Sequence, residues 1–186
     1  IENLSFNVSL GETIAFVGAT GSGKTTILSL IVRNYDIQKG RILIDGLDIK
    51  TIKIASLRRN IGQMLQDVFL FSGTINSNIK MRSSFSDEEV KEACYYVNAN
   101  HFIEQLPLQY NEEVRERGNN YSSGQRQLLS FARTIIHKPS LIILDEATAN
   151  IDAETEVLIQ DSLQKMMNIG TMIVVAHRLS TIQHAN

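Results

Sequence analysis

The sequence predicts an α/β fold in which a mostly parallel sheet carries an inserted block of helices. Short β-rich runs alternate with segments of helical period, which is the pattern of α/β proteins. Two of these runs, 141–144 and 172–175, are apolar at every position, as is typical of parallel strands covered on both faces. The stretch from about 67 to 138 instead has mainly helical patterns. We therefore expect a sheet core interrupted by a helical subdomain.

Length and composition indicate one globular domain. The 186 residues are 43% apolar and 20% charged, close to globular averages, which excludes collagen-like and wholly disordered chains. A net charge of -2 disfavours a surface built to hold nucleic acid, so no nucleic-acid partner is expected. The single Cys94 allows no intrachain disulfide, and its place on an apolar helical face indicates core packing. Apolar runs are far shorter than the roughly 18 residues of a membrane helix, so no bilayer-spanning segment is expected.

Six β-rich runs supply the strands of the expected core. They lie at about 3–8, 13–17, 41–45, 61–65, 141–145 and 171–176. The two fully apolar runs predict the centre of the sheet. Between them, apolar residues recur at helical spacing after Asp152, a candidate N-cap, which predicts a crossover helix. The residues that share its apolar face are Ile159, Leu163, Met166 and Met167.

Two helices are predicted within the inserted block. A capping box at 86–89 precedes apolar residues at helical spacing, namely Val90, Ala93, Cys94 and Val97. A second helix is expected to begin at Ser122 or Ser123 and to end before Pro139, because the residue ahead of proline disfavours helix. The expected organisation is one domain over 1–186, with its core at about 1–66 and 139–186 and its helical subdomain at about 67–138.

The strongest motif is a glycine-rich loop at 18–25, Gly-Ala-Thr-Gly-Ser-Gly-Lys-Thr, which fits the P-loop pattern. Its glycines allow the backbone to curl so that N–H groups point inward, and the following helix adds the positive end of its dipole. Lys24 would reach the β and γ phosphates of a nucleotide, and the Thr25 hydroxyl would ligate Mg²⁺. The alternative, a glycine-rich turn that matches by chance, is disfavoured by the flanking strand and helix.

Two acidic residues follow the apolar run 141–144. Asp145 lies at the carboxyl end of the predicted strand, where open α/β sheets bind ligands, and we expect it to hold Mg²⁺ mostly through water. Glu146 comes next and could orient and deprotonate an attacking water. The alternative is that both acids only end a strand and cap the next segment. The P-loop favours the metal site.

Upstream of this strand, residues 121–127, Tyr-Ser-Ser-Gly-Gln-Arg-Gln, resemble the signature sequence of ABC ATPases. Further elements of that family occur in its usual order along the chain: Gln66 in the Q-loop, 116–118 before the signature, 147–152 as the D-loop and His177 as the switch histidine. The segments 71–75 and 175–182 look specifically like those of exporters. The resemblance covers nearly the whole chain. It implies a P-loop NTPase with a RecA-like, mostly parallel sheet core, N-terminal antiparallel strands and an inserted helical subdomain.

The resemblance also assigns roles to residues. It implies that two such domains meet head to tail, so that ATP on one P-loop is covered by the signature of the other. The residues that would act on the partner's nucleotide are Ser122, Ser123, Gly124, Gln125 and Asp152. Gln66 is similar to the residue that touches the metal and the attacking water, and His177 to the one that contacts the γ-phosphate beside Glu146. The implied cofactors are ATP and Mg²⁺, the phosphate-binding residues are Gly18, Ala19, Thr20, Gly21, Ser22, Gly23, Lys24, Thr25 and Thr26, and the metal-binding residues are Thr25, Gln66 and Asp145.

The signature alone leaves another interpretation open, because Ser122 and Gln125 also form a plausible capping box. Ser123 replaces the usual glycine, while Glu146 and His177 are intact, which resembles one half of a heterodimeric exporter with one weaker ATP site. We expect the chain to be truncated at both ends and to act at the cytoplasmic face of a cell membrane, joined to a transmembrane domain. The alternatives are a soluble ABC-type ATPase of DNA maintenance and an importer ATPase subunit.

Overall fold

A four-stranded parallel sheet forms the centre of the computed structural model, which describes residues 1, 3–65, 67–145 and 151–175. In spatial order its strands are β1 (Thr13–Phe16), β8 (Thr171–Val175), β7 (Leu141–Asp145) and β4 (Ile61–Met64). The two fully apolar runs, β7 and β8, are the central strands, as the sequence predicts. The α/β class with a parallel core is confirmed.

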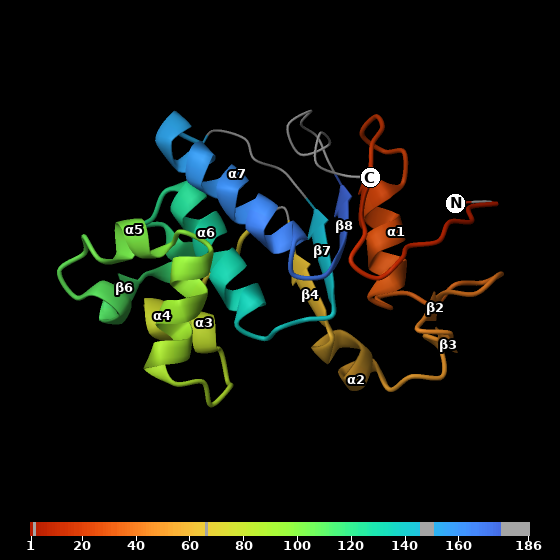
Figure 1. Ribbon diagram of the computed structural model, residues 1–186, viewed down its shortest axis with the longest axis horizontal. Coiled ribbons are helices and arrows are strands. Elements are labelled where there is room, and N and C mark those ends of the chain that lie inside the picture. Colours follow the sequence, from red (N-terminus) through yellow and green to blue (C-terminus); the bar gives the residue numbers. More distant parts are fainter. Residues whose placement is uncertain (2, 66, 146–150, 176–186) are drawn as a thin grey trace.

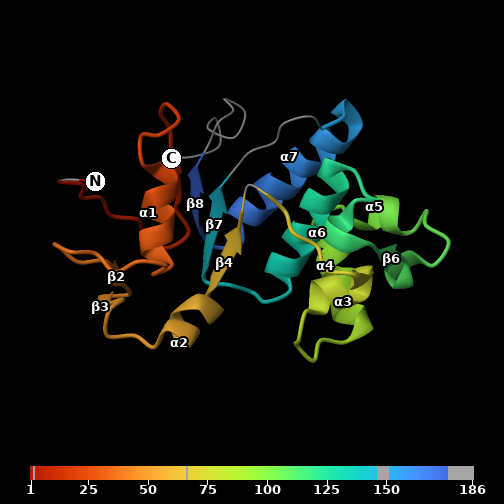
Figure 2. The same ribbon diagram turned by 180° about the vertical axis from the view of Figure 1, so that it is seen from behind.

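Helices cover both faces of this sheet (Figures 1 and 2). One face packs against α1 (Lys24–Ile31) and α2 (Ile54–Arg59), with residues 143, 173 and 175 turned toward them. The other packs against α6 (Ser123–Ile135) and α7 (Ala153–Met167), with residues 142, 144, 172 and 174 turned that way. Alternate side chains of a strand point to opposite faces, so burial on both sides accounts for the unbroken apolar runs.

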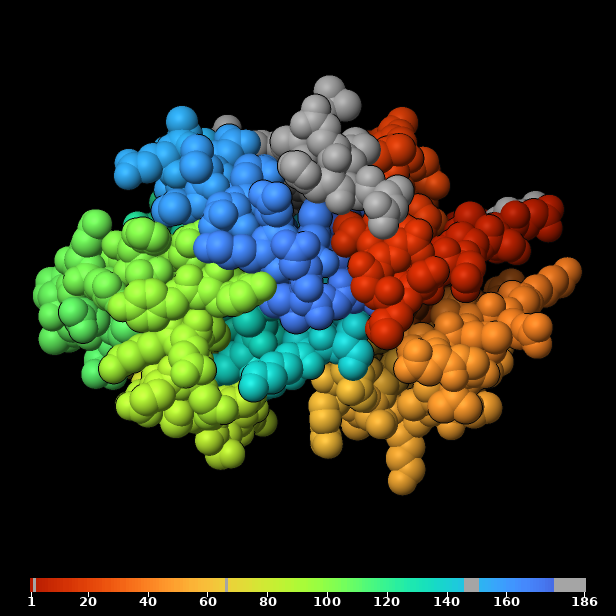
Figure 3. All heavy atoms as spheres, in the orientation of Figure 1, coloured from red at the N-terminus to blue at the C-terminus, as the bar shows by residue number. Residues whose placement is uncertain are grey.

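The stretch between β4 and β7 is folded mainly as helices, and Figure 3 shows this block lying directly against α7. Besides α6, its elements are β5 (Gly73–Thr74), α3 (Ile75–Lys80), α4 (Asp87–Tyr96), α5 (Asn100–Ile103), short 3₁₀ helices at Gln109–Asn111 and Glu116–Gly118, and β6 (Glu113–Val114), which pairs antiparallel with β5. Cys94 is fully buried in the block, as expected. Apolar residues of the block join those of one sheet face in a single cluster. The subdomain boundaries at 66/67 and 138/139 therefore stay a prediction.

Four of the helices begin with a side-chain N-cap. Thr74, Ser86 and Ser122 form capping boxes at α3, α4 and α6, and the Asp152 carboxylate accepts a hydrogen bond from the Thr155 N–H at α7. Each cap satisfies a backbone N–H that the first turn leaves open. The predicted starts of α4, α6 and α7 are confirmed, and α6 ends at Ile135, before Pro139.

Two strand predictions need correction. Residues 3–8 form no strand in the part of the chain that the structure describes; they are mostly exposed, and Phe6 packs edge-on against Phe16 at 5.3 Å. An alternating pattern does not make a strand without a neighbour to accept its hydrogen bonds. Of the predicted strand 41–45, only Leu43–Ile44 is a strand, β2, and it pairs antiparallel with β3 (Leu47–Asp48). Gly46, with φ 77°, makes the tight turn between these two strands.

Gly62 of β4 allows the sheet to approach the end of α6. A Cβ at this position would lie 2.5 Å from Thr134 Cγ2 and 2.8 Å from Pro139 Cγ. We expect Gly62→Ala to lower the free energy of unfolding by about 1–3 kcal/mol, the usual cost of overpacking a core. Urea unfolding measures this. Gly170→Ala is the matched control, because its Cβ would come no nearer than 3.6 Å to another atom; equal losses in both variants would contradict the packing argument.

Candidate active site

The P-loop and Asp145 lie at the same edge of the sheet. Phe16 at the end of β1 is in register with Val175 of β8, and Val175 is in register with Asp145 of β7. Neighbouring strands are about 4.8 Å apart, so about 10 Å separates the backbone of Phe16, two residues before the loop, from the Asp145 backbone. All four strands are parallel, so this edge collects their carboxyl ends. Ligands of open α/β sheets bind at such an edge.

The loop that follows β1 has the curled backbone its glycines predict. Gly21 and Gly23 adopt φ values of 84° and 93°, which residues with a Cβ rarely adopt. A Cβ on Gly18 would lie 3.2 Å from Ser22 Oγ, so the loop is also closely packed. These glycines let the chain reverse within a few residues and enter α1 at Lys24.

Helix α1 begins without a side-chain cap. Gly23 is its N-cap residue, and no acidic residue lies in the first turn. Among the described residues, no partner accepts a hydrogen bond from the backbone N–H groups of Lys24, Thr25 or Thr26. Four other helices satisfy such groups with a side chain. An uncapped helix start with open N–H groups is suited to an anion such as phosphate.

Lys24 is folded over the loop. Its side chain is only 7% exposed, and Nζ donates to the carbonyl oxygens of Gly18 at 2.7 Å and Ala19 at 2.9 Å. Carbonyl oxygens compensate part of the cost of burying an ammonium group. The charge is thus held on the loop that leads into α1, and both this charge and the open N–H groups of α1 favour a negatively charged ligand.

Asp145 supplies a carboxylate to the same edge. It is 7% exposed, and no donor among the described residues hydrogen-bonds to its side chain. A carboxylate that is largely removed from water is stabilised by a nearby cation, so this position suits a bound metal ion. Together with the exposed Thr25 hydroxyl it offers the oxygen ligands that Mg²⁺ prefers. The other predicted residues of this centre, Gln66, Glu146 and His177, lie outside the described residues.

The signature residues start α6 and pack on α7. Ser122 Oγ accepts a hydrogen bond from the Gln125 N–H, and Gln125 Oε1 accepts one from the Ser122 N–H. Ser122 and Gln125 therefore do form a capping box at the start of α6. Gly124 is buried so closely against α7 that a Cβ would collide with the Thr155 side chain. Thr155 N–H also donates to Asp152 at 2.8 Å, and this bond lowers the pKa of that carboxyl. The residues predicted to act in trans are thus brought together.

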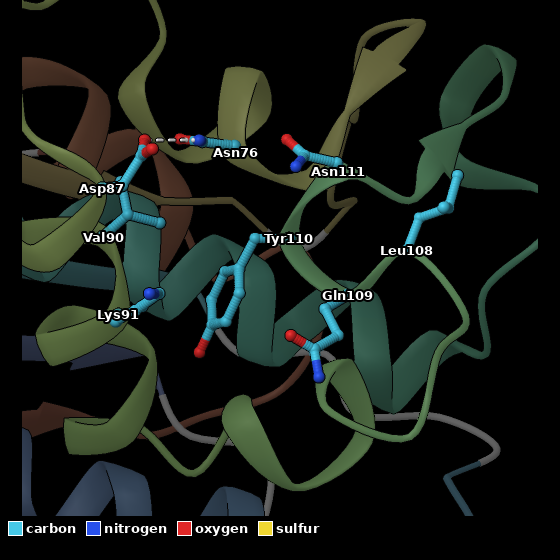
Figure 4. Close-up of a pocket in the computed structure, with 8 residues that line it drawn as sticks. All are labelled: Asn76, Asp87, Val90, Lys91, Leu108, Gln109, Tyr110 and Asn111. Carbon is cyan, nitrogen blue, oxygen red and sulfur yellow. Dashed lines mark hydrogen bonds between the residues drawn. The ribbon is translucent and has the colours of Figure 1, made fainter.

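A hollow of about 170 Å³ lies elsewhere, in the helical block (Figure 4). It is lined by Asn76, Asp87, Val90, Lys91 and the segment Leu108–Asn111, from α3, α4 and a 3₁₀ helix. Asn76 Oδ1 and the Tyr110 hydroxyl are buried without a hydrogen-bond partner in the described structure. These elements lie on the far side of the sheet from α1 (Figure 1), so the hollow is no part of the phosphate site.

Comparison with known proteins decides the family. The family model described as ABC transporter matches residues 1–149, which contain the P-loop, the signature and Asp145. The chain belongs to the ABC transporter family. The sequence-based recognition of this family is confirmed, and the chain is similar to an ABC exporter of known structure.

Related ABC transporter proteins are much longer than this chain. It is 54% identical over its whole length to a Streptococcus pneumoniae protein named as ABC transporter ATP-binding protein exp8, and covers 32% of it. It is 48% identical to the probable multidrug resistance ABC transporter ATP-binding/permease protein YheH of Bacillus subtilis, covering 28% of it. A bacterial Atm1-family ABC exporter solved with ATP bound matches 94% of this chain with a TM-score of 0.87 and 41% identity, and 31% of that exporter's chain is covered. No described helix here is long and apolar enough to cross a membrane.

One polar cluster of this ABC transporter chain was not predicted from the sequence. Asn78 of α3 is 2% exposed and binds Arg133 of α6, whose pKa is lowered by burial. One signal was available: Asn78 follows Ile75 at i+3 and precedes Ile79, so it lies on an apolar helical face. A buried asparagine needs several hydrogen-bond partners, but the sequence does not identify them.

Proposed function

We propose that this chain is the ATP-binding and ATP-hydrolysing domain of an ABC exporter. The observation that carries the proposal is the uncapped start of α1, with Lys24 and Asp145 at the same sheet edge. Two named relatives support it: one is called an ATP-binding/permease protein, and the other is an exporter solved with ATP bound.

The loop binds the nucleotide through its phosphates. The N–H groups of residues 24–26 donate to phosphate oxygens, and the helix dipole adds to the attraction. Lys24 exchanges the Gly18 and Ala19 carbonyls for the β and γ phosphates. The remaining loop residues, Gly18, Ala19, Thr20, Gly21, Ser22 and Gly23, form the cradle around them.

Hydrolysis depends on positioning more than on covalent chemistry. Bound Mg²⁺, held by Thr25, Gln66 and Asp145, would neutralise charge on the β and γ phosphates. Glu146 orients the attacking water and accepts its proton. His177 contacts the γ-phosphate, and Gln66 contacts the water.

A second ABC ATPase domain completes each site. In this proposal the two domains meet head to tail, and Ser122, Ser123, Gly124, Gln125 and Asp152 of one face the nucleotide on the other. The start of α6 suits the task, since small residues at a helix N-terminus present N–H groups and a dipole to the γ-phosphate. ATP then favours the closed dimer, and hydrolysis favours its opening.

The second partner is a transmembrane domain. We infer that it is fused to this chain, at the cytoplasmic face of a cell membrane, because the chain spans only 28–32% of the relatives named above and one of those is an ATP-binding/permease protein. Phe69 and Phe71 offer a contact surface: their rings are about half exposed and pack edge to face at 5.0 Å. Such a pair suits contact with a protein partner, because aromatic residues are enriched in protein interfaces.

The full-length protein in lipid nanodiscs tests the proposed function. We expect phosphate release from ATP that requires Mg²⁺ and stops when a chelator removes it. The same preparation without added ATP gives the background rate. If purified, folded protein released no phosphate above that background, the proposal would be wrong.

Ser123 gives a further prediction. It places a side chain where the family's usual glycine allows close approach to phosphate. If this signature serves a weaker site opposite a non-identical partner, Ser123→Gly should raise the turnover of that site while the site on this chain's own P-loop keeps its rate. Nucleotide trapping on each subunit separately measures both. Unchanged occupancy and turnover at both sites would contradict the heterodimer hypothesis.

A further inference from the structure

Arg133 joins α6 to the segment that leads from β4 into α3. Its Nη1 donates to the Phe69 carbonyl at 2.9 Å, and its Nε donates to the Asn78 carbonyl at 2.8 Å. Nη2 donates to Asn78 Oδ1 at 3.0 Å. All three bonds come from the fork of one guanidinium, whose planar geometry no lysine reproduces.

Asn78 continues this network into the same segment. Its Oδ1 accepts a hydrogen bond from the Phe71 N–H at 2.8 Å, and its Nδ2 donates to the carbonyls of Phe71 at 2.7 Å and Thr74 at 3.0 Å. The side chain is 2% exposed, so water cannot replace these bonds without local opening. We call Arg133 and Asn78 the tether, and residues 69–74 the tethered segment.

The tether lies between two parts of the proposed ATPase. The tethered segment begins three residues after Gln66, and α6 starts at the signature residues Ser122–Gln125. Arg133 is ten residues, about 15 Å, along α6 from Ser123. Leu70 of the segment is fully buried, which further fixes the segment against the block. One rigid helix thus carries the signature at one end and holds the chain downstream of Gln66 nearer the other.

We propose that Arg133 and Asn78 are positioning residues for ATP hydrolysis, because they fix the tethered segment to the signature helix. A shift of α6 when its signature meets the partner's nucleotide then moves the chain next to Gln66 as well. The two ATP sites of a dimer are thereby linked through one helix in each subunit. This inference rests on the proposed function.

Steady-state kinetics of the full-length transporter in nanodiscs tests the tether. Arg133→Lys keeps the charge but loses the fork, and Asn78→Ser replaces the amide that binds Phe71 and Thr74 with a shorter hydroxyl. We expect each to lower kcat for ATP by about tenfold to a hundredfold, since misplacing a positioning group by about 1 Å has such an effect. KM for ATP should stay within about twofold, because the P-loop is untouched.

Asn98→Ala is the matched control. Asn98 is also buried, and its amide donates to Leu158, Asp161 and Ser162 and accepts from Lys165, but none of these hydrogen-bond partners belongs to the tethered segment. We expect it to lower Tm about as much as the tether variants while kcat stays near that of the parent. A kcat that falls in step with Tm in all variants would assign the tether a structural role only.

Two failures can be told apart in the same assay. If the parent hydrolyses ATP and both tether variants keep its kcat, the tether inference is wrong and the proposed function stands. If the folded parent does not hydrolyse ATP at all, both are wrong. Should one tether variant fail to fold, the kcat of the other decides between these outcomes.

Discussion

Replacing Glu146 with Gln is expected to slow ATP hydrolysis by about 10²- to 10⁴-fold while ATP still binds. The amide keeps nearly the shape of the carboxyl but cannot accept the proton of the attacking water. The phosphate-binding groups of residues 18–26 are unchanged, so nucleotide affinity should stay close to that of the parent. Phosphate release and equilibrium binding of ATP to the full-length protein measure the two quantities.

Glu154→Gln is the control for this variant. Glu154 is an exposed carboxylate in the first turn of α7, and its loss weakens a favourable helix-dipole interaction by about 0.3–1 kcal/mol at most. Turnover of this control should match the parent. A Glu146→Gln protein that hydrolyses ATP at a near-normal rate would remove Glu146 from its proposed role.

Lys24→Ala is expected to weaken ATP binding by about tenfold to a thousandfold. Hydrogen bonds to a charged group are worth about 1.5–3 kcal/mol each, and every 1.4 kcal/mol is a factor of ten in affinity. Calorimetric titration with ATP and Mg²⁺ in the Glu146→Gln background measures the effect, because little nucleotide is then consumed.

Lys50→Ala tests whether the weaker ATP binding expected of Lys24→Ala is specific to the P-loop. Lys50 Nζ also donates to a backbone carbonyl, that of Ile37 at 2.8 Å, but it lies in an exposed segment beyond β3. Its removal deletes the same kind of group with the same charge. Equal weakening in both variants would show that general electrostatics, and not the loop, holds the phosphates.

The sheet core was predictable because its signals are local. Burial on both faces leaves unbroken apolar runs at β7 and β8, and side-chain caps mark the starts of α4, α6 and α7. The segment 3–8 shows the limit of such signals. Its alternating pattern is equally compatible with a strand and with exposed chain, and a partner strand, which sequence does not supply, decides between them.

The candidate site also has parts that the sequence predicts and parts that it does not. The P-loop is one continuous motif, so its curled backbone and the uncapped start of α1 follow from a few neighbouring residues. The tether cannot be predicted from neighbouring residues, because Asn78 and Arg133 are 55 residues apart and meet only when α3 packs on α6. The packing of Gly124 against Thr155 likewise depends on how α6 crosses α7.

The most direct test is a structure of the full-length Glu146→Gln protein with ATP and Mg²⁺. We predict a nucleotide with its phosphates on residues 18–26 and a metal beside Thr25 and Asp145. We also predict that Ser122–Gln125 face a second nucleotide held by the other ABC domain. ATP bound away from the loop, or a closed dimer in which the start of α6 meets no phosphate, would contradict these predictions.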